Sequence, residues 1–183
     1  MNKVNLGLFS DAVFPTNFLK LKYLGWLIIS NIFFLTNIPY PNSLKVFILR
    51  LFGAKIGNSV VIKPWVKIKL PWKLVLKDHI WLGENCWIDN ISNITIGSNA
   101  CISQGATLIT GNHDYTKVSF NLITKPIILE EGCWIGANAS VSGGVTVGNH
   151  AVLSMGSTAT KDLAPYTIYR GNPAIEVKKR VIS

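Results

Sequence analysis

An aliphatic residue returns at every sixth position along much of this 183-residue chain. A period of six cannot keep one side of an α-helix apolar, because successive apolar positions would rotate around the 3.6-residue cycle. The longest unbroken series is Leu129, Ile135, Val141, Val147, Leu153 and Ala159. Three shorter series precede it: Ile56, Ile62 and Ile68; Leu76, Leu82 and Ile88; Ile96, Ile102 and Leu108.

Short strands joined by tight turns do accommodate this period. Three six-residue sides make one triangular coil, and successive coils stack at the strand spacing of about 4.8 Å. The position four residues after each aliphatic is mostly small and is also expected to point inward. We place the coil starts at residues 56, 76, 96, 129, 147 and 165. The repeat therefore predicts an all-β parallel solenoid, here assigned to residues 51–165.

The six-residue repeat is interrupted in the stretch TLITGNHDYTKVSFNLITKPIIL, within the coil that starts at residue 96. We predict a loop excursion at 111–126 that carries His113. A flat coil face cannot surround a substrate, whereas a loop can, so this excursion is predicted to form a wall of a site. The alternative is a tolerated surface insertion with an incidental histidine. His79 and His150 fall at turn positions and are expected at the surface.

The residues before and after the repeat form separate segments. Residues 1–50 are expected to form a mostly helical cap over the first coil, because an open solenoid end exposes unpaired strand edges. Residues 23–44 carry no charge, but Asn and Pro interrupt them and no 18 consecutive residues are apolar. A helix packed on the domain is favoured, with attachment to a membrane surface as the alternative. Residues 166–183 are assigned to a C-terminal tail.

The net charge and the cysteines limit the kinds of partner and metal site that the chain can have. The chain has 18 Lys and Arg against 9 Asp and Glu, which favours an anionic partner such as nucleic acid, an anionic membrane or a phosphate-rich small molecule. Cys86, Cys101 and Cys133 fit no zinc-ligand spacing, so reduced thiols and no metal site are expected. No secretory signal is expected at the N-terminus, and the protein is predicted to be cytoplasmic.

Three tryptophans occupy outward positions of the repeat: Trp81, Trp87 and Trp134. Because an indole left in water is costly, each is expected to meet another subunit or a ligand. Packing between subunits is favoured for Trp81 and Trp87. Both interpretations stay open for Trp134.

The chain contains four characteristic motifs: WLGENCWIDN, ITIGSNACISQGATLITGNHDY, LITKPIILEEGCWIGANASVSGGVTVG and GSTATKDLAPYTIYRGNPA. These motifs resemble those of the hexapeptide-repeat O-acetyltransferases, and among them the colanic acid biosynthesis branch more than the galactoside and maltose enzymes. The resemblance covers residues 49–180 and departs from the family's usual corner at LKDH (76–79). It implies a left-handed parallel β-helix and a homotrimer with active sites between subunits.

The same resemblance implies roles for individual residues. His113 would be the general base that takes the proton of a sugar hydroxyl while its oxygen attacks the thioester of acetyl-CoA, in direct transfer. An imidazole suits this task because its ordinary pKa lies near 6.5. The acceptor side would comprise Asp89, Asn90, Asn112 and Asp114, although the last two could equally serve loop structure. The donor would contact Trp134, Ala137, Met155, Thr160, Lys161, Lys179 and Arg180.

We therefore expect an acetyl-CoA-dependent sugar O-acetyltransferase of surface polysaccharide biosynthesis, acting on capsule, exopolysaccharide or O-antigen. Its acceptor could be a sugar, a nucleotide sugar or a lipid-linked oligosaccharide, with a peripheral contact at the inner face of the membrane and no nucleic acid. The alternatives are a non-catalytic trimeric scaffold and an acyltransferase that uses a different acyl-CoA. A carbonic anhydrase of this fold would need clustered histidines, which the chain lacks.

Overall fold

The computed structural model describes residues 3–9 and 16–183, so residues 1–2 and 10–15 of the predicted cap lie outside the described part. Its helical elements are η1 (Leu6–Leu8), α1 (Asn17–Phe33), α2 (Asn42–Leu51) and η2 (Pro71–Lys73). Its strands are β1 (Lys55–Ile56), β2 (Val61–Ile62), β3 (Lys67–Ile68), β4 (Leu74–Leu76), β5 (Trp81–Leu82), β6 (Trp87–Asp89), β7 (Ile94–Ile96), β8 (Cys101–Ile102), β9 (Thr107–Ile109), β10 (Gly111–His113), β11 (Leu122–Thr124), β12 (Ile127–Leu129), β13 (Trp134–Ile135), β14 (Ser140–Ser142), β15 (Thr146–Val147), β16 (Val152–Leu153), β17 (Thr158–Ala159), β18 (Thr167–Gly171) and β19 (Ala174–Lys179).

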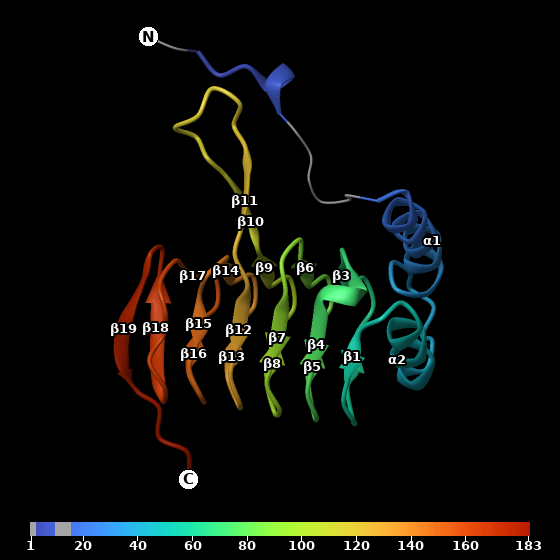
Figure 1. Ribbon diagram of the computed structural model, residues 1–183. Coiled ribbons are helices and arrows are strands. Elements are labelled where there is room, and N and C mark those ends of the chain that lie inside the picture. Colours follow the sequence, from blue (N-terminus) through green and yellow to red (C-terminus); the bar gives the residue numbers. More distant parts are fainter. Residues whose placement is uncertain (1–2, 10–15) are drawn as a thin grey trace.

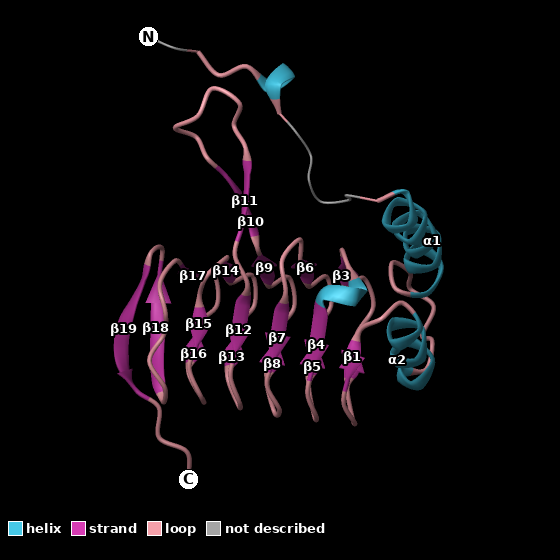
Figure 2. Ribbon diagram, in the orientation of Figure 1, coloured by secondary structure: helices cyan, strands magenta, loops and turns pink. Residues whose placement is uncertain are grey.

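The strands form a parallel solenoid with three faces (Figures 1 and 2). The first face is β1-β4-β7-β12-β15, the second is β2-β5-β8-β13-β16-β18-β19, and the third is β3-β6-β9-β14-β17. Ile56 pairs with Leu76, Leu76 with Ile96, and Ile96 with Leu129, as the coil starts predicted. Every aliphatic position of the four series is buried, which confirms the solenoid.

The last coil differs from the prediction. Val147 bridges to Leu163, not to residue 165, so this coil is two residues shorter than expected. Leu163 is buried and supplies the inward aliphatic, while Pro165 has no N–H to offer a strand. The segment assigned to a tail contains β18, which is parallel to β16, and β19, which returns antiparallel to β18.

One corner of the triangle carries all the additional residues. It joins the third face to the first, and it contains η2 after β3, the turn after β6 and the excursion after β9. Asn90 is fully buried there, where Oδ1 accepts a bond from Leu70 N (2.9 Å) and Nδ2 donates to Leu70 O (2.6 Å). One coil later, the buried Thr110 hydroxyl donates to Asp89 O (2.8 Å). Side chains thus join three successive layers, and the excursion starts from a fixed point.

Helices α1 and α2 lie at the first-coil end of the solenoid (Figure 1). The backbone carbonyls at the three aliphatic positions of that coil have no preceding coil whose N–H groups could donate to them. The helices provide side-chain donors instead. Trp26 Nε1 donates to Ile68 O (2.7 Å), Lys45 Nζ to Ile62 O (2.9 Å) and Arg50 Nη2 to Ile56 O (2.7 Å). Each face of the first coil therefore ends on a side chain that can only donate. No helix within residues 3–9 and 16–183 is long and apolar enough to cross a membrane.

Trp26 should contribute strongly to stability, because it is 1% exposed, bonded to Ile68 and packed against Phe34 and Phe52. We expect Trp26→Ala to lower the free energy of unfolding by about 3–5 kcal/mol. Leu24→Ala, on the exposed side of the same helix, should change it by less than about 0.5 kcal/mol. Denaturant titration of both variants measures the difference, and equal losses would contradict the role of Trp26.

Asn90→Ala should destabilise the corner, since both backbone groups of Leu70 would lose a buried partner. We expect a loss of at least about 2 kcal/mol in the free energy of unfolding. Asn93, exposed at the same corner, is the matched control: Asn93→Ala should cost less than about 0.5 kcal/mol. An Asn90→Ala protein as stable as wild type would show that the amide does not hold these coils together.

Candidate active site

The excursion is an antiparallel hairpin that stands away from the solenoid (Figure 1). Its two strands, β10 and β11, pair in register from Gly111 with Thr124 to His113 with Leu122. The N-terminal segment also reaches it, because Asn5 N donates to Val118 O (2.8 Å). The predicted loop at 111–126 is therefore a structured arm with a defined position for His113.

His113 lies between two aromatic side chains on this arm. Its ring stacks on Phe120, with centroids 4.4 Å apart and an angle of 5° between the planes, and Phe9 lies 5.7 Å away. Nδ1 is 2.9 Å from Phe120 O. Because a carbonyl oxygen only accepts, Nδ1 carries the hydrogen, and Nε2 of the neutral ring is left as the acceptor. The ring is thus fixed in orientation with one basic nitrogen available.

The neighbours of His113 in the GNHD motif hold the arm in shape. Asn112 Oδ1 accepts a bond from His113 N (2.7 Å), and Asp114 Oδ1 accepts one from Thr116 N (3.0 Å). The side-chain and backbone bonds from Thr116 lower the pKa of Asp114 from its ordinary value. Asn112 also lines a cavity of about 390 Å³ at the base of the arm, together with Lys125. Asp114 thus has the turn-forming bonds that the loop-structure alternative expects, whereas Asn112 lies in strand β10 and its side chain, within the described part of the chain, bonds only the next residue.

Asp89 and Asn90 do not lie beside His113. Asp89 is 8% exposed and lines a cavity of about 260 Å³ between α1 and the third face. Its Oδ1 has Lys69 Nζ at 2.9 Å and no other partner among the described residues. Both polar atoms of the Asn90 amide are hydrogen-bonded to the backbone of Leu70, as described above. Asn90 therefore offers no group to a ligand that approaches from solvent.

The second face carries an apolar groove of about 530 Å³ in its later coils. Four of the seven predicted donor residues line it: Trp134, Ala137, Met155 and Arg180. Trp134 Nε1 donates to Ser103 Oγ (2.8 Å), which holds the indole in position. Arg180 Nη1 donates to the carbonyls of Gly132 and His150, both at 3.0 Å, and places a guanidinium at the groove. The groove is thus mostly apolar, with a cation fixed at its wall.

The other three predicted donor residues lie elsewhere. Thr160 and Lys161 are exposed after β17, at a corner of the solenoid rather than on the second face. Lys179 is exposed on β19, where it bonds Thr167 Oγ1 (2.9 Å) and Glu176 (3.0 Å). Of these residues, the structure therefore brings none to the groove.

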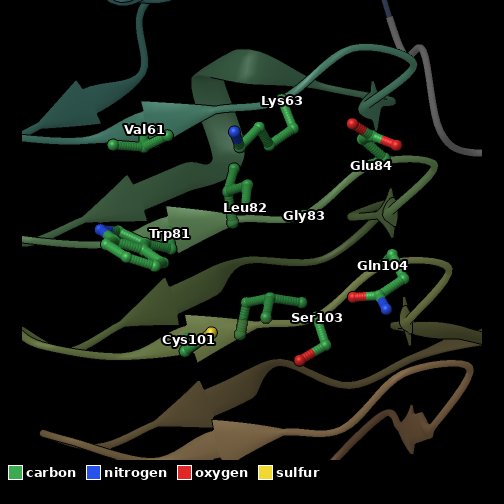
Figure 3. Close-up of a pocket in the computed structure, with 10 residues that line it drawn as sticks. Val61, Lys63, Trp81, Leu82, Gly83, Glu84, Cys101, Ser103 and Gln104 are labelled. Atoms are coloured by element: carbon green, nitrogen blue, oxygen red, sulfur yellow. The ribbon is translucent and has the colours of Figure 1, made fainter.

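A second cavity, of about 380 Å³, lies on the same face nearer the first coil (Figure 3). Ser103 and Gln104 line both cavities, so the two form one continuous surface along the face. Trp81 lies on it in register with Cys101 and Trp134, while Lys63, Glu84 and Gln104 lie at its edge. Sequence reasoning missed Ser103 and Gln104. The register that aligns Trp81 with Trp134 is the signal that could have found this surface.

The surface on the second face and the arm lie on opposite sides of one chain. The arm leaves the corner between the third and first faces, and in a triangular section that corner is opposite the second face. His113 and the Trp134 groove therefore do not form one site within a single chain. Burial raises the pKa of the Cys86 and Cys133 thiols to about 12, so neither is a nucleophile at neutral pH. The described residues contain no metal-binding group of three or more His, Cys, Asp or Glu.

Comparison with known proteins identifies related sequences and structures. Residues 126–161 match the family model described as the hexapeptide repeat of succinyl-transferase. The chain is 43% identical over 137 residues to WcaF of Escherichia coli K12, named as a colanic acid biosynthesis acetyltransferase, with 75% of each chain covered. It is 26% identical over 129 residues to the galactoside O-acetyltransferase of the same organism, covering 69% of this chain and 64% of that one.

Solved structures share the fold. The hexapeptide-repeat acetyltransferase VCA0836 of Vibrio cholerae superposes with a TM-score of 0.81 at 22% identity, covering 90% of this chain and 93% of that one. A galactoside acetyltransferase solved with coenzyme A gives a TM-score of 0.80 at 21% identity, covering 93% and 84%. A coil of opposite hand would not superpose in this way, so the left-handed β-helix is confirmed. The chain belongs to the hexapeptide-repeat acetyltransferase family.

Proposed function

We propose that this acetyltransferase moves the acetyl group of acetyl-CoA to a sugar hydroxyl, at sites shared between the subunits of a homotrimer. The observation that carries the proposal is the groove on the second face, which collects Trp134, Ala137, Met155 and Arg180. These residues were assigned to the donor from their motifs alone. VCA0836 is also known in complex with acetyl-CoA, and it superposes with a TM-score of 0.79.

The groove suits the two chemical parts of this donor. A pantetheine chain is extended and largely apolar, which matches the Trp134 indole and the Met155 side chain. The phosphates need a cation, and Arg180 is held at the groove by two backbone carbonyls. Gly136 lets two coils pack closely beneath the groove, since a Cβ there would lie 2.5 Å from the backbone N of Met155 in the next coil. We assign Thr160, Lys161 and Lys179 no contact with the donor within the groove.

A three-fold axis parallel to the solenoid supplies the missing histidine. Rotation about such an axis keeps each residue at the same height along the solenoid. The arm leaves the solenoid between β9, which follows β8 in the chain, and β12, which precedes β13. The arm of one subunit is then level with Cys101 and Trp134 on the second face of its neighbour. His113 would enter between the donor groove and the Trp81 cavity, which leaves that cavity for the acceptor.

The reaction then requires one base and no covalent enzyme intermediate. Nε2 of His113 takes the hydroxyl proton as the sugar oxygen forms its bond to the thioester carbonyl carbon. The tetrahedral intermediate collapses, the C–S bond breaks, and the imidazolium returns the proton to the departing thiolate. The Nδ1 bond to Phe120 O stabilises the imidazolium between these steps. Holding both substrates together contributes through proximity.

For the acceptor we propose a surface polysaccharide or its precursor, supported by the likeness to WcaF, whose name assigns it to colanic acid biosynthesis. Within the site, Asn112 and Asp114 would shape the arm beside the acceptor. Asp89 lies on the far side of the corner, under α1, and Asn90 is internal. We therefore propose that the acceptor is recognised by the arm and by the Trp81 cavity of the adjacent subunit.

His113→Ala should lower acetyl-CoA turnover by about 10²–10⁴-fold, the usual contribution of a positioned acid–base group. Oligomer mass and coenzyme binding should stay unchanged, since the residue lies outside the core and the groove. His79→Asn is the matched control, because His79 is exposed at a turn with φ 57°, which asparagine also adopts. Thiol release with a panel of sugar acceptors measures turnover. A His113→Ala enzyme with more than about half of wild-type turnover would exclude the base.

Mixed trimers test whether the site is shared. Ala137→Trp should fill the donor groove and abolish activity, while its own arm stays intact. A refolded equal mixture of His113→Ala and Ala137→Trp chains should recover about one quarter of wild-type activity, because most trimers then contain one complete site. Neither variant refolded alone should recover any. If mixing restores nothing while light scattering shows mixed trimers, the site is not formed by two subunits.

A further inference from the structure

Helix α1 has an apolar face that no part of the described chain covers. Phe18, Leu21, Leu24, Ile28 and Ile32 are each between 48% and 72% exposed. Their spacing of three, three, four and four residues places them along one side of the helix. Trp26, which packs on the first coil, lies on the opposite side of the helix. This outer face therefore points away from the solenoid, at its first-coil end (Figure 1).

The positive charge of the chain is concentrated at the same end. Residues 16–77 hold 10 of the 18 basic residues and none of the nine acidic ones, a net charge of +10. Residues 78–183 hold seven basic and eight acidic residues, a net charge of −1. Residues 16–77 comprise α1, α2 and the first coil with its corner, and they end just after β4. The basic surplus noted in the sequence is thus a property of one end of the molecule.

Only part of that charge is used inside the protein. Lys45 and Arg50 bond the first coil, and Lys69 pairs with Asp89. Lys20 and Lys22 border the outer face of α1 on its two sides: Lys20 is exposed, whereas Lys22 Nζ lies over the Trp72 ring, 4.8 Å from its centroid. Between residues 16 and 77 there is no acidic residue to offset them. An apolar face bordered by lysines matches an anionic lipid surface, where the aliphatic groups enter the acyl boundary and the ammonium groups meet the headgroups.

Other occupants fit this face less well. A second copy packed face to face would bring two +10 ends together, which like-charge repulsion opposes. A nucleic acid would use the cations, but five aliphatic and phenyl side chains in a row on a helix offer it little. Charge and apolarity together favour lipid.

We propose that the outer face of α1 docks this protein on an anionic membrane surface, with the helix lying in the interface. The first-coil end of the solenoid then faces the bilayer. Subunits related by a three-fold axis along the solenoid would present three such faces on one side, so that weak single contacts add up. Docking depends on α1 alone and would hold for a single chain.

Flotation of the purified protein with vesicles tests the proposal. Wild type should float with vesicles that contain phosphatidylglycerol, bind pure phosphatidylcholine vesicles less, and be released in part by high salt. Leu21→Ser/Ile28→Ser should lower the partition coefficient by roughly 100-fold, because two inserted aliphatic side chains are lost. Its melting temperature and its turnover on a soluble acceptor should not change, since neither residue belongs to the core or the site.

Ile175→Ser/Val177→Ser is the matched control. Both residues are exposed aliphatics on β19, at the opposite end of the solenoid, and this variant should float as wild type does. Wild type that stays soluble with anionic vesicles at low salt would overturn the proposal. So would equal binding by the two double variants. A drop in oligomer mass for Leu21→Ser/Ile28→Ser would instead make the face a contact between copies. Turnover in solution reports the acetyl transfer separately.

Discussion

Every feature of this protein depends on the hydrogen-bonded register between successive coils. Ile96 pairs with Leu129 and Leu129 with Val147, so each inward aliphatic rests on the one before it. Because the coils are held in register, their corners stack as well, and residues 70, 90 and 110 join one corner through buried side chains. The arm with His113 starts where that stack ends. The proposed base, on a projecting hairpin, thus acquires a fixed position from the packing of the core below it.

The ends of the solenoid obey a different constraint, since a terminal coil has neighbours on one side only. The outer backbone carbonyls of the first coil need hydrogen-bond donors, and the side chains of Trp26, Lys45 and Arg50 provide one at each of the three faces. At the other end β19 covers β18 in antiparallel pairing. Neither arrangement follows the six-residue rule, because the groups to be satisfied are backbone groups and not inward side chains.

This difference explains what the sequence could predict. The inward positions are a local requirement repeated many times, so the coil starts at residues 56, 76, 96, 129 and 147 and the break at the arm were predicted correctly. The start of the last coil was predicted two residues too far along the chain, because the six-residue spacing no longer holds at the end of the repeat. The β18–β19 hairpin was missed for the same reason. Asn90 was assigned to the acceptor on its motif, and only the register shows that Leu70 consumes its amide. Four residues that line the second-face groove were named by resemblance, whereas Ser103 and Gln104 needed the alignment of neighbouring strands.

The length of the arm has a consequence for folding. Most coil-to-coil contacts join residues 18 to 20 positions apart, such as Leu129 with Val147 and Leu76 with Ile96, so coils can form one after another from nearby chain. Only the coil that carries the arm must close a loop of 33 positions, as from Ile96 to Leu129. Loop-closure entropy grows with the logarithm of length, and this longer step adds only about 0.5 kcal/mol. The chain can therefore carry an arm of almost any length at this corner with little penalty in stability, and the arm's reach can change while the solenoid beneath it stays the same.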